Sequence, residues 1–100
     1  MYTIRLTQEF QDWLDALTDI RAQVRIVARL RRAEAGNLGD WKPVGDHVSE
    51  MRVDAGPGYR LYFMRMGKVV IVMLAGDDKS SQKRDIKQAQ RIASELESEL

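Results

Sequence analysis

Hydrophobic residues recur with two different periods along this chain, and the change of period predicts where helices give way to strands. The alternating segment Tyr2-Thr3-Ile4-Arg5-Leu6 predicts a short first strand, and Thr7 is a suitable N-cap for a helix that begins near Gln8. Apolar residues then recur every three or four positions, as on one face of a helix. They are Phe10, Trp13, Leu14 and Leu17 in a first helix and Ile20, Val24, Val27 and Leu30 in a second. Gly36-Asn37 supplies a stop for the second helix.

From Val48 onward the pattern is that of strands. Residues 48–54, 59–66 and 69–75 are separated by turn-forming, glycine-containing segments, which predicts a three-stranded antiparallel meander. The third segment is apolar on both faces, as expected of a central strand. Residues 37–46 are rich in Gly, Asp and Pro and show no period, so we expect a loop that leads into the sheet.

A last helix is predicted after Gly76-Asp77-Asp78, with Ser80 or Ser81 as its N-cap. Its apolar positions are Ile86, Ala89, Ala93, Leu96 and Leu100. The predicted order is therefore β-α-α-β-β-β-α. We expect one α+β domain spanning residues 1–100, with a small antiparallel sheet, two N-terminal helices and a C-terminal helix.

Composition excludes several classes of function. The 100 residues contain no cysteine, which excludes disulfides, thiolate metal sites and a thiol nucleophile. The chain shows no His/Cys cluster and no Gly-rich phosphate loop, so we expect neither a metal nor another cofactor. The N-terminus lacks a secretory signal and the longest apolar run, 69–75, is too short for a bilayer, so we expect a soluble, cytoplasmic protein without membrane contact.

Candidate chemistry lies on the first two strands of the meander. If the apolar residues of segment 59–66 face the helices, Arg60 and Tyr62 face outward, beside Glu50 and Arg52 of the preceding strand, and Lys79 reaches the rim of that face. Arginine forks bind phosphate, a carboxylate or lysine transfers protons, and a phenol stacks on a base, as RNA cleavage by the ribose 2′-hydroxyl requires. The alternative is an ordinary solvated sheet face with mixed charges.

Charge elsewhere is less specific. The net charge is only +1, which does not indicate a nucleic-acid-binding protein. A stripe of arginines on the second helix either contacts RNA or an acidic partner, or is simply the solvated face of an amphipathic helix, which we favour. The stripe consists of Arg21, Arg25, Arg29 and Arg32.

Four ordered motifs and a short following segment give the sequence a family resemblance. They are Gly36-Asn37-Leu38-Gly39-Asp40, Glu50-Met51-Arg52-Val53, Gly56-Pro57-Gly58-Tyr59-Arg60-Leu61-Tyr62 and Gly76-Asp77-Asp78-Lys79-Ser80-Ser81-Gln82, with Asp85-Ile86 after them. In this order they resemble the phage-derived, HigB-like "addiction module killer" branch of the RelE superfamily, the toxins of type II toxin–antitoxin systems. The resemblance covers nearly the whole chain and implies the RelE-like fold.

The resemblance also implies an endoribonuclease that cleaves mRNA, in many members on the ribosome, and so inhibits translation. It implies an antitoxin partner with a helix-turn-helix DNA-binding domain. The toxin is then expected to associate with promoter DNA only indirectly, through this antitoxin. Arg60 matches the strand arginine of the family site, and Arg52 matches a basic position on the preceding strand. Lys79 lies near a basic position that comes later in the family sequence. Glu50 matches a position that is acidic in some members and basic in others. The C-terminal His or Tyr of better-known members is replaced here by Gln82-Lys83-Arg84.

The missing residue leaves the proton-transfer group open between Glu50, Tyr62 and Lys79, with positioning on the ribosome as a further possibility. It also leaves two main functions open. The first is the ribonuclease. The second is a binding module that complexes the antitoxin and modulates its promoter repression with little or no catalysis. A third reading is a phage-derived protein that has lost its function.

Overall fold

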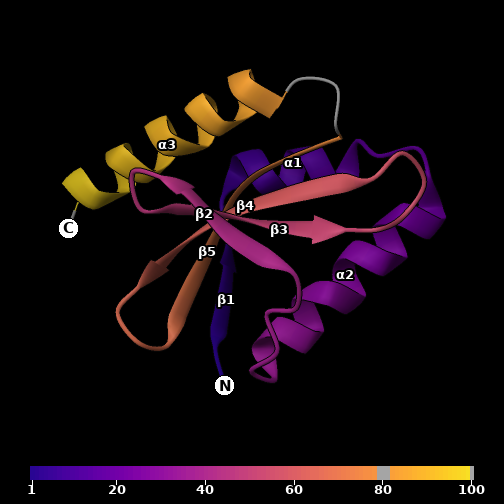
Figure 1. Ribbon diagram of the computed structural model, residues 1–100, viewed down its shortest axis with the longest axis horizontal. Helices are drawn as coiled ribbons and strands as arrows, with labels where there is room; N and C mark the ends of the chain where they lie inside the picture. The colour runs from indigo at the N-terminus through magenta and orange to yellow at the C-terminus, as the bar shows by residue number, and fades with distance from the viewer. Residues whose placement is uncertain (79–81, 100) are drawn as a thin grey trace.

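The computed structural model describes residues 1–78 and 82–99, which form a five-stranded sheet with helices on both faces (Figure 1). The order of strands in the sheet is β1-β5-β4-β3-β2. The strands are β1 Thr3–Leu6, β2 Trp41–Gly45, β3 Val48–Val53, β4 Tyr59–Met66 and β5 Val70–Asp78, and the helices are α1 Gln8–Asp15, α2 Ile20–Glu34 and α3 Gln82–Ser98. The α+β class predicted from the sequence is confirmed.

The sheet differs from the predicted antiparallel meander in three ways. It is mixed, because β1 pairs parallel with β5. It has an additional strand, β2, within the segment that we expected to be a loop. Pro43 and Gly45 are unusual within strands, so the sequence pattern did not predict this one. An edge strand tolerates both residues, because one side of its backbone forms no hydrogen bonds with a neighbouring strand. Finally, β5 continues to Asp78 instead of ending at Ala75.

Helices α1 and α2 cover one face of the sheet and begin where the sequence predicts. The Thr7 hydroxyl accepts a 3.1 Å hydrogen bond from the Phe10 N–H and so caps α1. Asp19 caps α2 through the N–H groups of Arg21 and Ala22. The core on this side contains, among others, Phe10, Leu14, Ile26, Leu30, Met51, Leu61, Phe63, Ile71 and Met73.

The orientation of α2 contradicts the solvated-face reading for one of its arginines. The buried side of the helix is built from Ala22, Ile26, Arg29, Leu30 and Ala33. Arg29 is only 9% exposed, whereas the apolar residues Ile20, Val24 and Val27 face solvent. The alanines explain this choice, because small side chains let the helix approach the sheet closely.

Helix α3 packs on the opposite face of the sheet and gives it a second core (Figure 1). Ala89, Ile92 and Ala93 of α3 contact the alternate side chains of the central strands. The sheet residues of this core are Val48, Tyr62, Met64, Val72, Leu74 and Ala75. The face that carries the candidate chemistry is therefore covered over much of its area rather than solvated.

Candidate functional site

Strand pairing brings together the four candidate residues that the structure describes. In the antiparallel register of β3 and β4, Glu50 lies opposite Tyr62 and Arg52 lies opposite Arg60. Residues directly opposite each other project to the same face of a sheet, so all four side chains share one face. The fifth candidate, Lys79, lies outside the described residues.

The burial of these side chains differs from the prediction that Arg60 and Tyr62 face outward. Tyr62 and Glu50 are both fully buried, and the Arg60 side chain is 13% exposed. Only the Arg52 side chain, at 52%, is widely accessible. The prediction was wrong for Tyr62 because it did not place α3 on this face.

Glu50 is the centre of a cluster of positive charge. One of its carboxylate oxygens lies 3.6 Å from Lys42 Nζ and 3.7 Å from Arg52 Nε, and the other lies 3.7 Å from Arg60 Nε. A buried carboxylate is stable only when it is paired, and here three strands supply cations to it. Glu50 thus holds both arginines at fixed positions on the sheet.

Asp77 is a site residue that the sequence reasoning missed. It lies on β5 opposite Arg60 in the strand register, is 5% exposed, and accepts a 2.7 Å hydrogen bond from the Tyr62 hydroxyl. The sequence pattern predicts that this strand ends at Ala75, whereas it continues to Asp78. The signal was nevertheless present, because Asp77 follows Ala75 at the period of two that defines a strand face.

Burial shifts the ionisation of this pair. It raises the pKa of Asp77 from 3.8 to about 7, with the neighbouring Asp85 carboxyl raising it further and the Tyr62 hydrogen bond and Arg60 charge opposing the shift. Burial, followed by the bond to Asp77, also raises the pKa of Tyr62 well above its ordinary value. Tyr62 is therefore a neutral donor, and Asp77 changes charge near neutrality.

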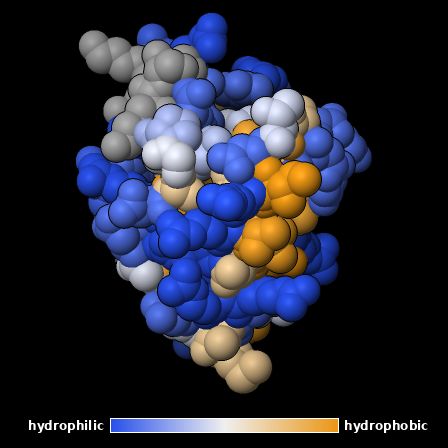
Figure 2. All heavy atoms as spheres, turned by 90° about the vertical axis from the view of Figure 1, so that its right-hand side faces the viewer, coloured by the Kyte–Doolittle hydropathy of each residue, from blue (hydrophilic) through white to orange (hydrophobic). Residues whose placement is uncertain are grey.

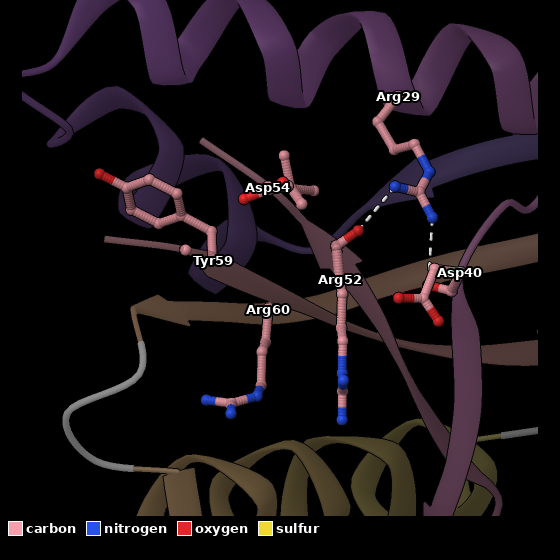
Figure 3. Close-up of a pocket in the computed structure, with 8 residues that line it drawn as sticks. Arg29, Asp40, Arg52, Asp54, Tyr59 and Arg60 are labelled. Atoms are coloured by element: carbon pink, nitrogen blue, oxygen red, sulfur yellow. Dashed lines mark hydrogen bonds between the residues drawn. The ribbon is translucent and has the colours of Figure 1, made fainter. Parts of the chain in front are cut away.

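A cavity of about 450 Å³ opens beside the two arginines. Arg29, Arg52 and Arg60 line it together with Asp40, Asp54 and Tyr59 (Figure 3). In Figure 3 the side chains of Arg52 and Arg60 extend in the same direction, toward α3. Nε and Nη1 of Arg60 are buried and form no hydrogen bond with the described residues. Such groups are rare in native proteins and call for an acceptor, which a bound anion would provide.

Arg29 fixes the backbone around this cavity. From α2 it donates hydrogen bonds of 2.6 Å to the carbonyl of Arg52 and 3.1 Å to that of Asp40 (Figure 3). It donates a third, of 3.0 Å, to the carbonyl of Leu38. Desolvation on burial, together with the nearby charge of Arg32, lowers the pKa of Arg29. Gly39 allows this arrangement, because a Cβ there would lie 2.4 Å from Arg29 Nη2.

Residues 1–78 and 82–99 contain neither a candidate metal site nor a candidate membrane span. No group of three or more His, Cys, Asp or Glu side chains there is arranged to hold a metal ion. No helix in these ranges has both the length and the apolar character needed to cross a membrane.

Comparison with known proteins gives the geometry a family context. Residues 12–97 match the family model described as "Phage derived protein Gp49-like (DUF891)". An uncharacterized protein of Haemophilus influenzae (strain ATCC 51907 / DSM 11121 / KW20 / Rd) is 45% identical over 93 residues, which cover 93% of this chain and 94% of that protein. This chain therefore belongs to the Gp49-like family of phage-derived proteins, a family associated with toxin–antitoxin systems.

Proposed function

We propose that this chain is a RelE/HigB-like toxin that cleaves mRNA and that a cognate antitoxin neutralises. The observation that carries the proposal is the pair Arg52 and Arg60, directly opposite on adjacent strands and both ion-paired with buried Glu50 beside an open cavity. Two guanidiniums so placed bind one phosphate group and stabilise the negative charge that develops on it during cleavage.

In the proposed reaction the ribose 2′-hydroxyl loses its proton and its oxygen attacks the adjacent phosphorus. The bond from phosphorus to the 5′ oxygen of the next nucleotide breaks, and that oxygen takes up a proton. The products are a 2′,3′-cyclic phosphate and a 5′-hydroxyl end. Because arginines supply the positive charge, the reaction needs no metal ion.

The buried positions of Glu50 and Tyr62 define what they contribute to this proposal. Neither reaches RNA from a fully buried position, so we assign them as positioning residues: Glu50 for the two arginines and Tyr62 for Asp77. Base stacking by Tyr62, considered from the sequence, is no longer part of the proposal. Lys79 stays the sequence-based candidate for proton transfer.

Induction of the chain alone in a bacterial host, with mapping of mRNA 5′ ends by primer extension, tests the proposal. We expect growth arrest and new cuts with the wild type and neither with Arg60→Ala, a loss of about 100-fold or more for a transition-state contact. Arg91→Ala is the matched control, since Arg91 is exposed on α3 and pairs only with Glu95 among the described residues. Arrest by Arg60→Ala equal to that of the wild type would refute the site.

The second candidate function is the binding module without catalysis. It is favoured by the burial of Glu50 and Tyr62. Among the candidate residues that the structure describes, this burial leaves arginines but no accessible carboxylate or phenol to transfer a proton. Intact mRNA and unimpaired growth with a folded, accumulated wild-type protein would select this function. The antitoxin would then be the principal ligand.

A further inference from the structure

The exposed side of α2 carries an apolar surface that no described part of the chain covers. Ile20, Val24 and Val27 are 71%, 62% and 36% exposed and follow one another at steps of four and three residues, which places them along one side of the helix. We name these three residues the α2 stripe. Figure 2 shows apolar side chains gathered in one band among hydrophilic ones on the side of the molecule where α2 lies.

The α2 stripe borders a shallow groove of about 370 Å³, lined by Gln23, Val24, Val27, Ala28 and Arg31. An apolar groove along a helix matches the apolar face of a second helix, whose side chains fit between its ridges. A nucleic acid backbone is a poorer match, because phosphates do not bury valine side chains.

The charges around the α2 stripe define the partner further. Four exposed arginines of α2 lie along it or beside it, and none of them forms an ion pair with the described residues. They are Arg21, Arg25, Arg31 and Arg32. The only acidic residue of α2 is Glu34, at its C-terminal end. At 3.6 residues per turn Arg21, Arg25 and Arg32 fall on one side of the stripe and Arg31 falls in line with it, so a complementary surface carries carboxylates along one side of an apolar face.

We propose that the α2 stripe is the docking surface for an acidic amphipathic helix of a partner protein, and, resting on the proposed function, that this partner is the antitoxin. The sheet separates this surface from the tips of Arg52 and Arg60, which extend toward α3 (Figure 3). The groove beside the stripe also shares no lining residue with the cavity, so the antitoxin would anchor on the toxin without filling the cavity itself.

Fluorescence anisotropy with two synthetic helical peptides tests this surface. Both carry leucines at the spacing of the α2 stripe, one flanked by glutamates and the other by lysines. We expect the full chain to bind the acidic peptide at least about tenfold more tightly than the basic one. Val24→Asp should weaken binding of the acidic peptide by about tenfold or more. Val69→Asp is the control, since Val69 is 52% exposed between β4 and β5.

Several outcomes would overturn the proposal: no binding of either peptide, equal binding of both, or binding insensitive to Val24→Asp. Self-association of the chain that Val24→Asp abolishes would identify a second copy as the occupant instead. Binding of a single-stranded RNA probe that depends on Val24 would identify RNA. The Arg60→Ala variant should still bind the acidic peptide, because peptide binding requires no RNA cleavage. This measurement separates the docking surface from the proposed ribonuclease activity. Either proposal can therefore fail while the other stands.

Discussion

Tyr62 on β4 donates a 2.7 Å hydrogen bond to Asp77 on β5; both residues are buried, and Tyr62 belongs to the core that α3 forms with the sheet. The Tyr62→Phe variant keeps the ring and loses only this bond. We expect it to lower the free energy of unfolding by about 1–3 kcal/mol, the range for a hydrogen bond to a group that becomes charged. The loss should be larger above pH 7, where the carboxylate is the acceptor. Tyr2→Phe is the control, and equal losses in the two variants would contradict the prediction.

Asp77 should make stability depend on pH in the direction opposite to that of a salt-bridged carboxylate. Its pKa in the folded protein, about 7, lies above its ordinary value of 3.8, so the folded state holds the proton more tightly. Its contribution to stability is full below about pH 4, falls as the pH rises to about 7, and is constant above that. The change is a few kcal/mol, since each pKa unit corresponds to about 1.4 kcal/mol.

The Asp77→Asn variant checks this linkage, because asparagine still accepts the Tyr62 hydrogen bond and cannot ionise. Denaturant unfolding at about pH 5 and about pH 8 should show a smaller fall in stability for Asp77→Asn than for the wild type. A wild-type protein whose stability does not fall over this interval would contradict the assigned pKa.

Arg29 should be intolerant of lysine although the charge is retained. Its planar fork serves the carbonyls of Arg52, Leu38 and Asp40 at once, whereas a lysine ammonium cannot reproduce that geometry. We expect Arg29→Lys to cost about 1–3 kcal/mol for the buried carbonyl left unsatisfied. Arg32→Lys, on the exposed side of the same helix, should cost less than about 0.5 kcal/mol. Chemical denaturation of both variants measures these two losses in the free energy of unfolding.

The convergence of the candidate residues was predictable, whereas their burial was not. Alternation along two neighbouring strands was enough to place Glu50, Arg52, Arg60 and Tyr62 on one face. Whether that face is solvated depends on which side of the sheet α3 packs against. The periodicity of α3 shows that it has an apolar side but contains no information on which sheet face that side covers.

Helix α2 shows a second limit of predicting the buried side of a helix from its hydrophobic pattern. Its sequence offers two possible buried sides, and Ile20, Val24 and Val27 look more hydrophobic than the side with Ala22 and Arg29. The structure buries the second side, because small residues allow close packing and Arg29 satisfies three backbone carbonyls. Those carbonyls lie outside the helix, in the segment that leads into β2 and on β3, so the helical periodicity of α2 contains no information about them.

The position of β5 in the sheet determines when this protein can fold during its own synthesis. β1 is the first strand to be made, yet its strand neighbour is β5, with Thr3 opposite Val70. β5 also completes the pairing of β4 and supplies Asp77 to the site. Because such long-range pairings form only once both strands are available, chains interrupted before β5 lack the strand that joins β1 to the rest of the sheet. The mixed sheet and the Tyr62–Asp77 pair are therefore assembled only after β5 has been made, whereas the arginine pair needs only β3 and β4.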